Sequence, residues 1–314
     1  MRSVVFLQKR DFFGNRLIHL PLLYELKHAF TENELVVFSP FESSYFFKDI
    51  GLADEVNVYS YGFLRMLRWL RSLKPDLIIS LRPRSSWLNL AIGLSGAKER
   101  LGFKTAISRV LFSGTVKRNT SVYRPLDFLK LLEPIGIYAS PEKFFREKVK
   151  KGIIKLQQNR ECFCLMPGGG TGEFKRWGIG NFLGFCQRIK ENQRNATFTF
   201  ILGEAEKDYI EQIQSSSVAK DSLILFNESV PSIAQVVAAC KVTIANDCGP
   251  SHIAQMMKVP YVGIFSNHDG NAHERIAEWF FEHEKAVAVT SEPLKDMKSI
   301  PVEQIEKAVS QVLS

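Results

Sequence analysis

The sequence is poor in the residue patterns that build disulfide frameworks and metal sites. Its 314 residues include five cysteines, an odd number, and no two of them form a CxxC pair. This pattern argues against both a disulfide-stabilised fold and a structural zinc site. The six histidines form no HxxxH motif. We therefore expect no protein-bound metal.

Long hydrophobic runs are also missing. Near the amino terminus, the apolar stretch between Arg2 and Lys9 is too short for the core of a signal peptide and far too short to cross a bilayer. We therefore expect the chain to begin in the cytoplasm.

Acidic residues are scarce in the first half of the chain. Residues 1–150 hold 24 Lys and Arg against 14 Asp and Glu, whereas residues 151–314 hold 17 against 19. Between Arg65 and Arg124, thirteen basic residues accompany just Asp76 and Glu99. This excess predicts a polyanionic partner or an anionic membrane surface, and the alternative is a solvated basic face. No nucleic-acid-binding motif accompanies the charge, so no nucleic-acid partner is expected.

Short apolar runs alternate with helical periodicity along the whole chain, and 45% of the residues are hydrophobic. This alternation is typical of βαβ units with mainly parallel sheets, and the length supplies two cores of ordinary size. The expected strands and helices of the first half are residues 3–8, 17–30, 34–39, 63–73, 76–81 and 86–96. Those of the second half are residues 162–167, 182–190, 198–203, 209–214, 223–226, 233–240, 242–247, 252–257 and 261–266.

The helix expected at residues 63–73 is amphipathic. Its apolar side is predicted to contain Phe63, Leu64, Leu67 and Leu70, and its basic side Arg65, Arg68 and Arg71. Such a basic side is suited to lipid headgroups.

A charged, weakly apolar stretch at residues 141–160 separates the halves. It predicts one domain at residues 1–155 and a second at 156–314. A last helix is expected at residues 301–314, either on its own domain or packed back on the first.

The pattern of residues 242–265 predicts a strand, a tight turn, a helix, a loop and a second strand. Gly249 and Pro250 suit the start of the helix, where unpaired backbone N–H groups and the helix dipole favour a diphosphate. Asp247 can bind the ligand or simply cap the turn. His252, in the first helical turn, is close enough to contact the same phosphates or to be structural.

Two further turns follow strands. In residues 163–177, three consecutive glycines allow close approach of the backbone to a ligand, and Lys175 and Arg176 can neutralise charge on a leaving diphosphate, unless they are merely exposed. The opening turn, within residues 8–23, lies where open α/β sheets bind ligands, but it lacks a GxGxxG dinucleotide motif.

These segments together resemble the glycosyltransferase family 9, the ADP-heptose:lipopolysaccharide heptosyltransferases. Residues 246–269 (NDCGPSHIAQMMKVPYVGIFSNHD) and 167–182 (PGGGTGEFKRWGIGNF) are similar to the family's two carboxyl-terminal blocks. Residues 13–23 (FGNRLIHLPLL) and 76–103 are similar to its opening turn and its S-G-A-x-x-R-I-G-F stretch. The resemblance covers nearly the whole chain.

The resemblance implies a GT-B fold, with two Rossmann-like α/β domains whose parallel sheets face across a cleft, acceptor on the first and nucleotide sugar on the second. The implied activity is metal-independent, cofactor-free, inverting transfer of a heptose from ADP-heptose to the anionic glycolipid of the lipopolysaccharide inner core, at the cytoplasmic face of the inner membrane. The donor-binding residues implied are Gly168, Gly169, Gly170, Thr171, Lys175, Glu204, Glu206, Asp247, Cys248, Gly249, Pro250, Ser251 and His252. The acceptor-binding residues expected on the basic half are Arg10, Arg16, Arg82 and Arg84. Lys175 would hold the donor phosphates, and Glu206 is slightly favoured over Glu204 for the nucleoside or sugar hydroxyls.

The sequence departs from the family at its general base. The family has Asp after the glycine of the opening turn, and this chain has Asn15 after Gly14. An amide cannot accept the proton of the acceptor hydroxyl, and losing a positioned base costs about 10²- to 10⁴-fold in rate. Three hypotheses follow: Asp11 takes over as base, Asn15 merely positions the acceptor, or the chain binds a nucleotide sugar without turnover. A donor with another sugar or nucleotide is a further alternative.

Overall fold

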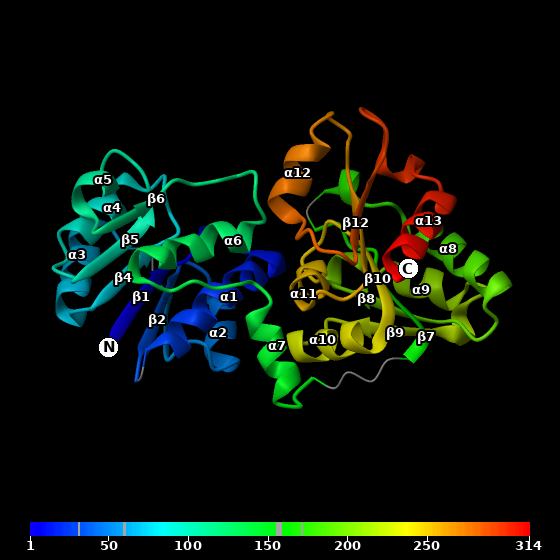
Figure 1. Cartoon of the computed structure of the whole chain (residues 1–314), viewed down its shortest axis with the longest axis horizontal. Coiled ribbons are helices and arrows are strands. Elements are labelled where there is room, and N and C mark those ends of the chain that lie inside the picture. Colours follow the sequence, from blue (N-terminus) through cyan, green and yellow to red (C-terminus); the bar gives the residue numbers. More distant parts are fainter. Residues whose placement is uncertain (31, 59–60, 155–158, 171) are drawn as a thin grey trace. The chain divides into compact units, whose positions relative to one another are not determined.

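The computed structural model describes residues 1–30, 32–58, 61–154, 159–170 and 172–314. They form two compact units, Met1–Phe144 and Phe145–Ser314 (Figure 1), called the first and second unit below. The predicted domain boundary between residues 155 and 156 lies outside the described residues. Helix α7 (Lys143–Lys150) occupies part of the stretch expected to be a linker, and its residues Phe144 and Phe145 are buried.

The first unit contains a parallel six-stranded sheet in the order β3-β2-β1-β4-β5-β6. The strands are β1 (Arg2–Phe6), β2 (Glu34–Ser39), β3 (Glu55–Val58), β4 (Leu77–Ser80), β5 (Glu99–Phe103) and β6 (Gly114–Val116). The helices are α1 (Phe13–Ala29), α2 (Phe46–Asp49), α3 (Phe63–Leu73), α4 (Ser86–Gly93), α5 (Ser108–Leu111) and α6 (Arg124–Leu129). Parallel strands need such crossover helices, which cover both faces of the sheet.

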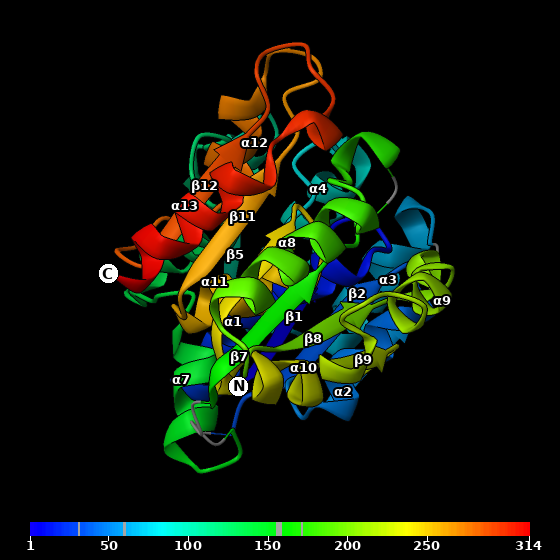
Figure 2. The ribbon, with the colours of Figure 1, turned by 90° about the vertical axis from the view of Figure 1, so that its right-hand side faces the viewer.

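The second unit repeats this plan in the strand order β12-β11-β10-β7-β8-β9, again all parallel. Its strands are β7 (Asn159–Met166), β8 (Thr197–Leu202), β9 (Ser222–Phe226), β10 (Cys240–Asn246), β11 (Tyr261–Phe265) and β12 (Ala286–Thr290). Its helices are α8 (Ile179–Asn192), α9 (Tyr209–Gln214), α10 (Val230–Ala239), α11 (Ser251–Met257), α12 (Ala272–Trp279) and α13 (Val302–Leu313). Helices α8 and α13 lie side by side on one face of the sheet (Figure 2).

Each sheet has its own apolar core. In the first unit, the strand residues Val4, Phe6 and Ile78 pack against Met66 and Leu70 of α3. In the second unit, the fully buried Trp177 packs on Phe182 and donates its indole N–H to the carbonyl of Ile300 at 2.9 Å. The predicted strands and helices of both halves are confirmed.

The predicted orientation of α3 is wrong at one position. Leu64 does not join the apolar side, because 66% of its surface is exposed, and Met66 is buried instead. Leu64 precedes Arg68 by four residues and Arg71 by seven, so a helix of 3.6 residues per turn places it on their exposed stripe. Among the helices of the described residues, none combines the length and hydrophobicity needed to cross a bilayer.

Candidate active site

In the second unit, the candidate site is built from loops that follow β7, β8 and β10. Because these strands are parallel neighbours, their carboxyl ends meet at one edge of the sheet. The structure thereby brings together the predicted residues Gly168, Lys175, Glu206 and Asp247. Thr171 lies outside the described residues.

Lys175 and Asp247 form the central ion pair of this edge. The Lys175 Nζ lies 2.5 Å from Asp247 Oδ2, and the two side chains are 28% and 9% exposed. Asp247 directly follows β10, and its backbone N–H donates to the carbonyl of Ile264 at 3.0 Å, which fixes the start of the turn. The carboxylate therefore holds a partly exposed ammonium group beside the turn that leads into α11, where an incoming phosphate can compete for it.

A second ion pair supports the glycine-rich loop. Arg176 Nη2 lies 3.0 Å from Glu206 Oε1, and Glu206 Oε2 accepts from the Gly203 N–H at 3.2 Å. A Cβ atom on Gly168 would lie 3.2 Å from the Glu206 carboxyl carbon, and one on Gly169 would lie 2.6 Å from Arg176 Cγ. A side chain at position 169 would therefore force the loop to shift, and one at position 168 would be tight, because the loop packs directly on these side chains. Glu204 is exposed and accepts from the Asn227 amide at 2.9 Å.

The turn into α11 is tightly packed. Ser251 Oγ donates to the carbonyl of Cys248 at 2.7 Å, and burial raises the pKa of the Cys248 thiol to about 12. Burial also lowers the pKa of His252 to about 4; the nearby Asp247 carboxylate opposes this shift and the Lys175 ammonium adds to it. His252 is therefore neutral near pH 7 and can offer a hydrogen bond but no charge. The helix begins at Ser251, one residue after the predicted Pro250.

Two side chains that the sequence prediction missed organise this edge. Asn246 is fully buried; its amide donates to the Pro167 carbonyl at 2.7 Å and accepts from the Trp177 N–H at 3.4 Å. It therefore ties the β7 loop to the end of β10. Phe174 packs on His268 with ring centroids 4.2 Å apart and the ring planes tilted by 36°, which joins that loop to the one after β11. In the sequence, the feature that could have pointed to Asn246 is its position immediately before Asp247.

The first unit presents its own carboxyl edge. Asp11 is exposed and accepts a hydrogen bond from Ser43 Oγ. Asn15 is 8% exposed, and its Nδ2 forms no hydrogen bond within the described residues. The guanidinium of Arg16 lies over the rings of Phe13 and Phe46, and burial lowers its pKa although Asp11 opposes the shift. Asp11 is thus the accessible carboxylate of the opening turn, and Asn15 is a buried donor.

The other predicted acceptor residues differ in exposure. Arg82 is buried over the rings of Phe6 and Phe38, its Nε donates to the Leu7 carbonyl at 2.5 Å, and burial lowers its pKa to about 10. Arg10 and Arg84 are exposed. The sequence prediction missed a further cation at this edge.

That cation is Arg124, which is 1% exposed and lies 3.2 Å from Asp127. Burial is the main cause that lowers its pKa to about 10, and the neighbouring Arg118 and Arg10 lower it further. Asp127 opposes this shift, and Arg10 and Arg118 add to it, so the three arginines act on one another electrostatically. The sequence signal was the basic run that ends at Arg124.

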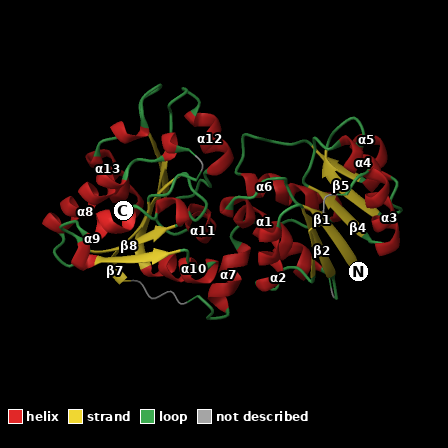
Figure 3. Ribbon diagram, turned by 180° about the vertical axis from the view of Figure 1, so that it is seen from behind, coloured by secondary structure: helices red, strands yellow, loops and turns green. Residues whose placement is uncertain are grey.

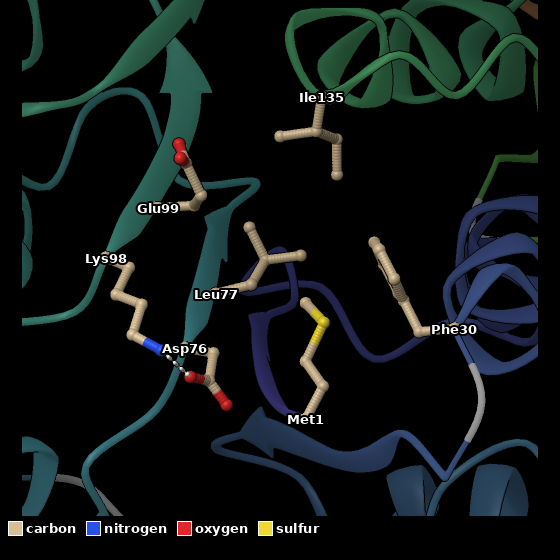
Figure 4. Close-up of a pocket in the computed structure, with 7 residues that line it drawn as sticks. All are labelled: Met1, Phe30, Asp76, Leu77, Lys98, Glu99 and Ile135. Carbon is tan, nitrogen blue, oxygen red and sulfur yellow. Dashed lines mark hydrogen bonds and ion pairs between the residues drawn. The ribbon is translucent and has the colours of Figure 1, made fainter.

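A separate pocket of about 510 Å³ lies at the opposite, amino-terminal end of the first sheet (Figure 4). It is lined by Met1, Phe30, Asp76, Leu77, Lys98, Glu99 and Ile135. Lys98 and Asp76 form an ion pair on one side of it at 3.0 Å (Figure 4). Within the described part of the chain, no three His, Cys, Asp or Glu side chains are arranged to hold a metal ion.

Comparison with known proteins gives consistent results. The family model described as glycosyltransferase family 9 (heptosyltransferase) matches residues 91–300. Lipooligosaccharide heptosyltransferase 2 of Campylobacter jejuni serotype O:2 is 23% identical over 266 residues, covering 83% of this chain and 80% of that protein. The solved structure of Escherichia coli heptosyltransferase WaaC with ADP gives a TM-score of 0.71 at 12% identity, covering 99% of this chain and 100% of that one. A family 9 glycosyl transferase from Veillonella parvula gives 0.69 at 15% identity, covering 99% and 97%.

Proposed function

The chain belongs to glycosyltransferase family 9, the heptosyltransferases, and we propose on this premise that it moves a heptose from ADP-heptose to a lipopolysaccharide inner-core acceptor. It is a glycosyltransferase with the GT-B fold, built from two Rossmann-like α/β units. The predicted family, fold class and enzyme class are confirmed.

The observation that carries the donor proposal is the Lys175–Asp247 pair at 2.5 Å beside the turn into α11. In the proposed complex, Lys175 neutralises the diphosphate as the glycosidic bond breaks, and backbone N–H groups near Gly249 bind its oxygens. We assign to Glu206, which is buried against Gly168, the role of accepting hydrogen bonds from donor hydroxyls. The related heptosyltransferase structure with bound ADP agrees with an adenine nucleotide.

The acceptor proposal rests on the cationic edge of the first unit. A glycolipid of the inner core carries negative charge, for which Arg10, Arg16, Arg82 and Arg84 are suitable partners. Because such an acceptor is anchored in a bilayer, we place the enzyme in the cytoplasm at the membrane face. We assign the acceptor, and not the nucleotide sugar, to this edge.

For the chemical step, we propose inverting transfer with Asp11 as general base. The acceptor hydroxyl gives its proton to the Asp11 carboxylate and its oxygen forms the new bond to the anomeric carbon, while the nucleoside diphosphate leaves with the bonding electrons. Asn15 then donates its amide N–H to an acceptor oxygen. Positive charge at the leaving group comes from Lys175, so the proposal requires no cofactor and no protein-bound metal.

Thermal unfolding with added nucleotides tests the donor assignment. At a hundredfold excess over Kd, a ligand stabilises by about 2.7 kcal/mol, which raises Tm by roughly 5–10 °C in a domain of this size. We expect ADP and ADP-heptose to produce this shift in the natural chain, and Lys175→Met to reduce it strongly. Lys190→Met is the matched control, because Lys190 is similarly exposed at 24% and ion-paired with Asp221 away from the loop.

Stabilisation by UDP but not by ADP would overturn the heptose donor and favour another nucleotide sugar. A chain that no nucleoside diphosphate stabilises would contradict the placement of the donor at Lys175 and Asp247.

A further inference from the structure

One face of the first unit has an unusual composition. Helices α3, α4 and α5 lie together on one side of the first sheet, and α1, α2 and α6 lie on the other (Figures 1 and 3). Arg71 of α3 donates to the carbonyl of Leu94, directly after α4, at 3.1 Å. A Cβ atom on Gly93 of α4 would lie 2.5 Å from Leu111 of α5. The three helices therefore form one continuous surface, called the α3–α5 face below.

Large apolar side chains protrude from the α3–α5 face. The exposed fractions are 66% for Leu64, 38% for Leu90, 42% for Leu94 and 81% for Val110. Leu90 and Leu94 are one helical turn apart, so they lie on the same side of α4. Apolar groups gathered in this way are suited to a partner that removes them from water.

Positive charge surrounds these apolar groups. Between Phe63 and Leu111 the chain has ten Lys and Arg and just two acidic residues, Asp76 and Glu99. Asp76 is paired with Lys98 at 3.0 Å, and Glu99 accepts from Ser113 Oγ at 2.7 Å. Leu64 shares the exposed stripe of α3 with Arg68 and Arg71, and Arg109 is exposed next to Val110. Several of these charged residues lie outside the three helices. Within α3, α4 and α5 the charged residues are Arg65, Arg68, Arg71 and Arg109, so the charge on these helices is entirely basic.

We propose that the α3–α5 face docks on the surface of an anionic lipid bilayer. Arginines bind the lipid phosphates, and Leu64, Leu90, Leu94 and Val110 enter the boundary between headgroups and acyl chains. Exposed leucine and valine favour this occupant over a nucleic acid, which offers mainly phosphate charge to such a face. The inference deepens the proposed function, since it rests on an acceptor held in a membrane, but it requires neither nucleotide nor acceptor for its test.

Co-sedimentation of the full chain with sucrose-loaded vesicles tests the proposal. One set contains phosphatidylcholine alone and the other contains phosphatidylcholine with phosphatidylglycerol. The variants are Arg68→Gln with Arg109→Gln, which removes charge, and Leu64→Ser with Val110→Ser, which removes apolar surface. The control, Lys207→Gln with Leu223→Ser, makes the same types of change on exposed positions of the second unit.

We expect binding to the anionic vesicles alone, weakened by salt because the interaction is partly electrostatic. The arginine variant should partition roughly 25-fold more weakly, since each of the two basic residues near the surface contributes about fivefold. The apolar variant should lose about tenfold, and the control should bind like the natural chain. Each variant should keep the natural Tm and its shift with ADP.

Equal binding to both vesicle types, or equal loss in the control, would overturn the docking face. Binding of the chain to acidic protein or nucleic acid but not to vesicles would overturn it too. If the donor proposal fails instead, ADP will not raise the Tm although the chain still binds the vesicles. The two failures are therefore distinguishable.

Discussion

The two units share one topology and differ in the chemistry at their carboxyl edges. Both sheets are parallel, and the order β3-β2-β1-β4-β5-β6 is repeated by β9-β8-β7-β10-β11-β12 read from the other end. At the edge of the second unit, Lys175 and Arg176 each pair with a carboxylate. At the edge of the first unit, Arg82 meets aromatic rings and a backbone carbonyl instead. The same scaffold thus carries two different sites.

This difference concerns whether a cation at the edge already has an anionic partner. A cation already paired with a carboxylate is held in position before its ligand arrives, and phosphate binding exchanges one partner for another. Burial lowers the pKa of Arg82 to about 10, and no carboxylate of the described residues forms an ion pair with it. An anionic acceptor would supply the missing charge. Arg82 therefore differs from Lys175 and Arg176, and also from Arg124 of its own unit, which is paired with Asp127.

The largest expected effect lies at the opening turn of the first unit. Asp11→Asn removes the proposed base, so kcat should fall by about 10²- to 10⁴-fold, with KM for the donor nearly unchanged. Asn15→Ala removes a hydrogen-bond donor and should instead raise KM for the acceptor, with kcat lowered by less than about tenfold. Steady-state kinetics with both substrates varied measures the two effects.

Asp49→Asn is the matched control, because Asp49 is another exposed aspartate of the first unit, at the end of α2. It should leave both constants unchanged. A deeper loss of kcat in Asn15→Ala than in Asp11→Asn would contradict the assignment of the base. A natural chain that binds ADP-heptose but transfers nothing, and gains activity with Asn15→Asp, would support loss of catalysis in this chain.

The topology could be predicted from the sequence because long apolar strands alternate with amphipathic helices. The strands β3, β5, β6 and β12 were not predicted. β3 (EVNV) and β5 (ERLGF) mix polar with apolar residues, and β6 (GTV) has three residues, so the hydrophobic pattern of these three is weak. Leu64 shows a further limit, since apolar character alone does not decide which side of a helix is buried.

The site was predicted in part. The motif resemblance placed Lys175 and Asp247 in one donor site, but their contact joins residues 72 positions apart and depends on the pairing of β7 with β10. Arg124 was not predicted, because its importance comes from burial next to Asp127 and from the proximity of Arg10 and Arg118. Such tertiary contacts leave no local pattern in the sequence.

The next largest effect concerns the second unit. Lys175→Met removes the charge that stabilises the leaving diphosphate and leaves the carboxylate of Asp247 beside it. The specificity constant kcat/KM for the donor should fall by about 10²- to 10³-fold, and Lys190→Met should change it little. If Arg82→Met, in the first unit, weakens the donor more than Lys175→Met does, the division of donor and acceptor between the units is wrong.

The smallest expected effect is on the pH dependence of stability, and it arises from one buried histidine in each unit. Burial lowers the pKa of His252 to about 4 and of His19 to about 3, whereas an unfolded histidine titrates near 6.5. Between about pH 6.5 and 4 the unfolded chain therefore binds more protons than the folded one, so the free energy of unfolding rises with pH in that window. The stabilisation is complete above pH 6.5 and decreases as the pH falls.

Denaturant unfolding at several pH values should show this slope, which each histidine steepens by at most about 1.4 kcal/mol per pH unit. His252→Gln and His19→Gln should each flatten it by up to that amount, whatever they do to absolute stability. His273→Gln, at an exposed position, should leave it unchanged. Because the Asp247 carboxylate and Lys175 ammonium both act on His252 but not on His19, Lys175→Met should shift the titration in the second unit alone. Removing the ammonium should raise the pKa of His252, so the loss of stability on acidification should still begin near pH 6.5 but level off at a higher pH and be smaller in total. An unchanged profile would contradict the coupling between the ion pair and this histidine.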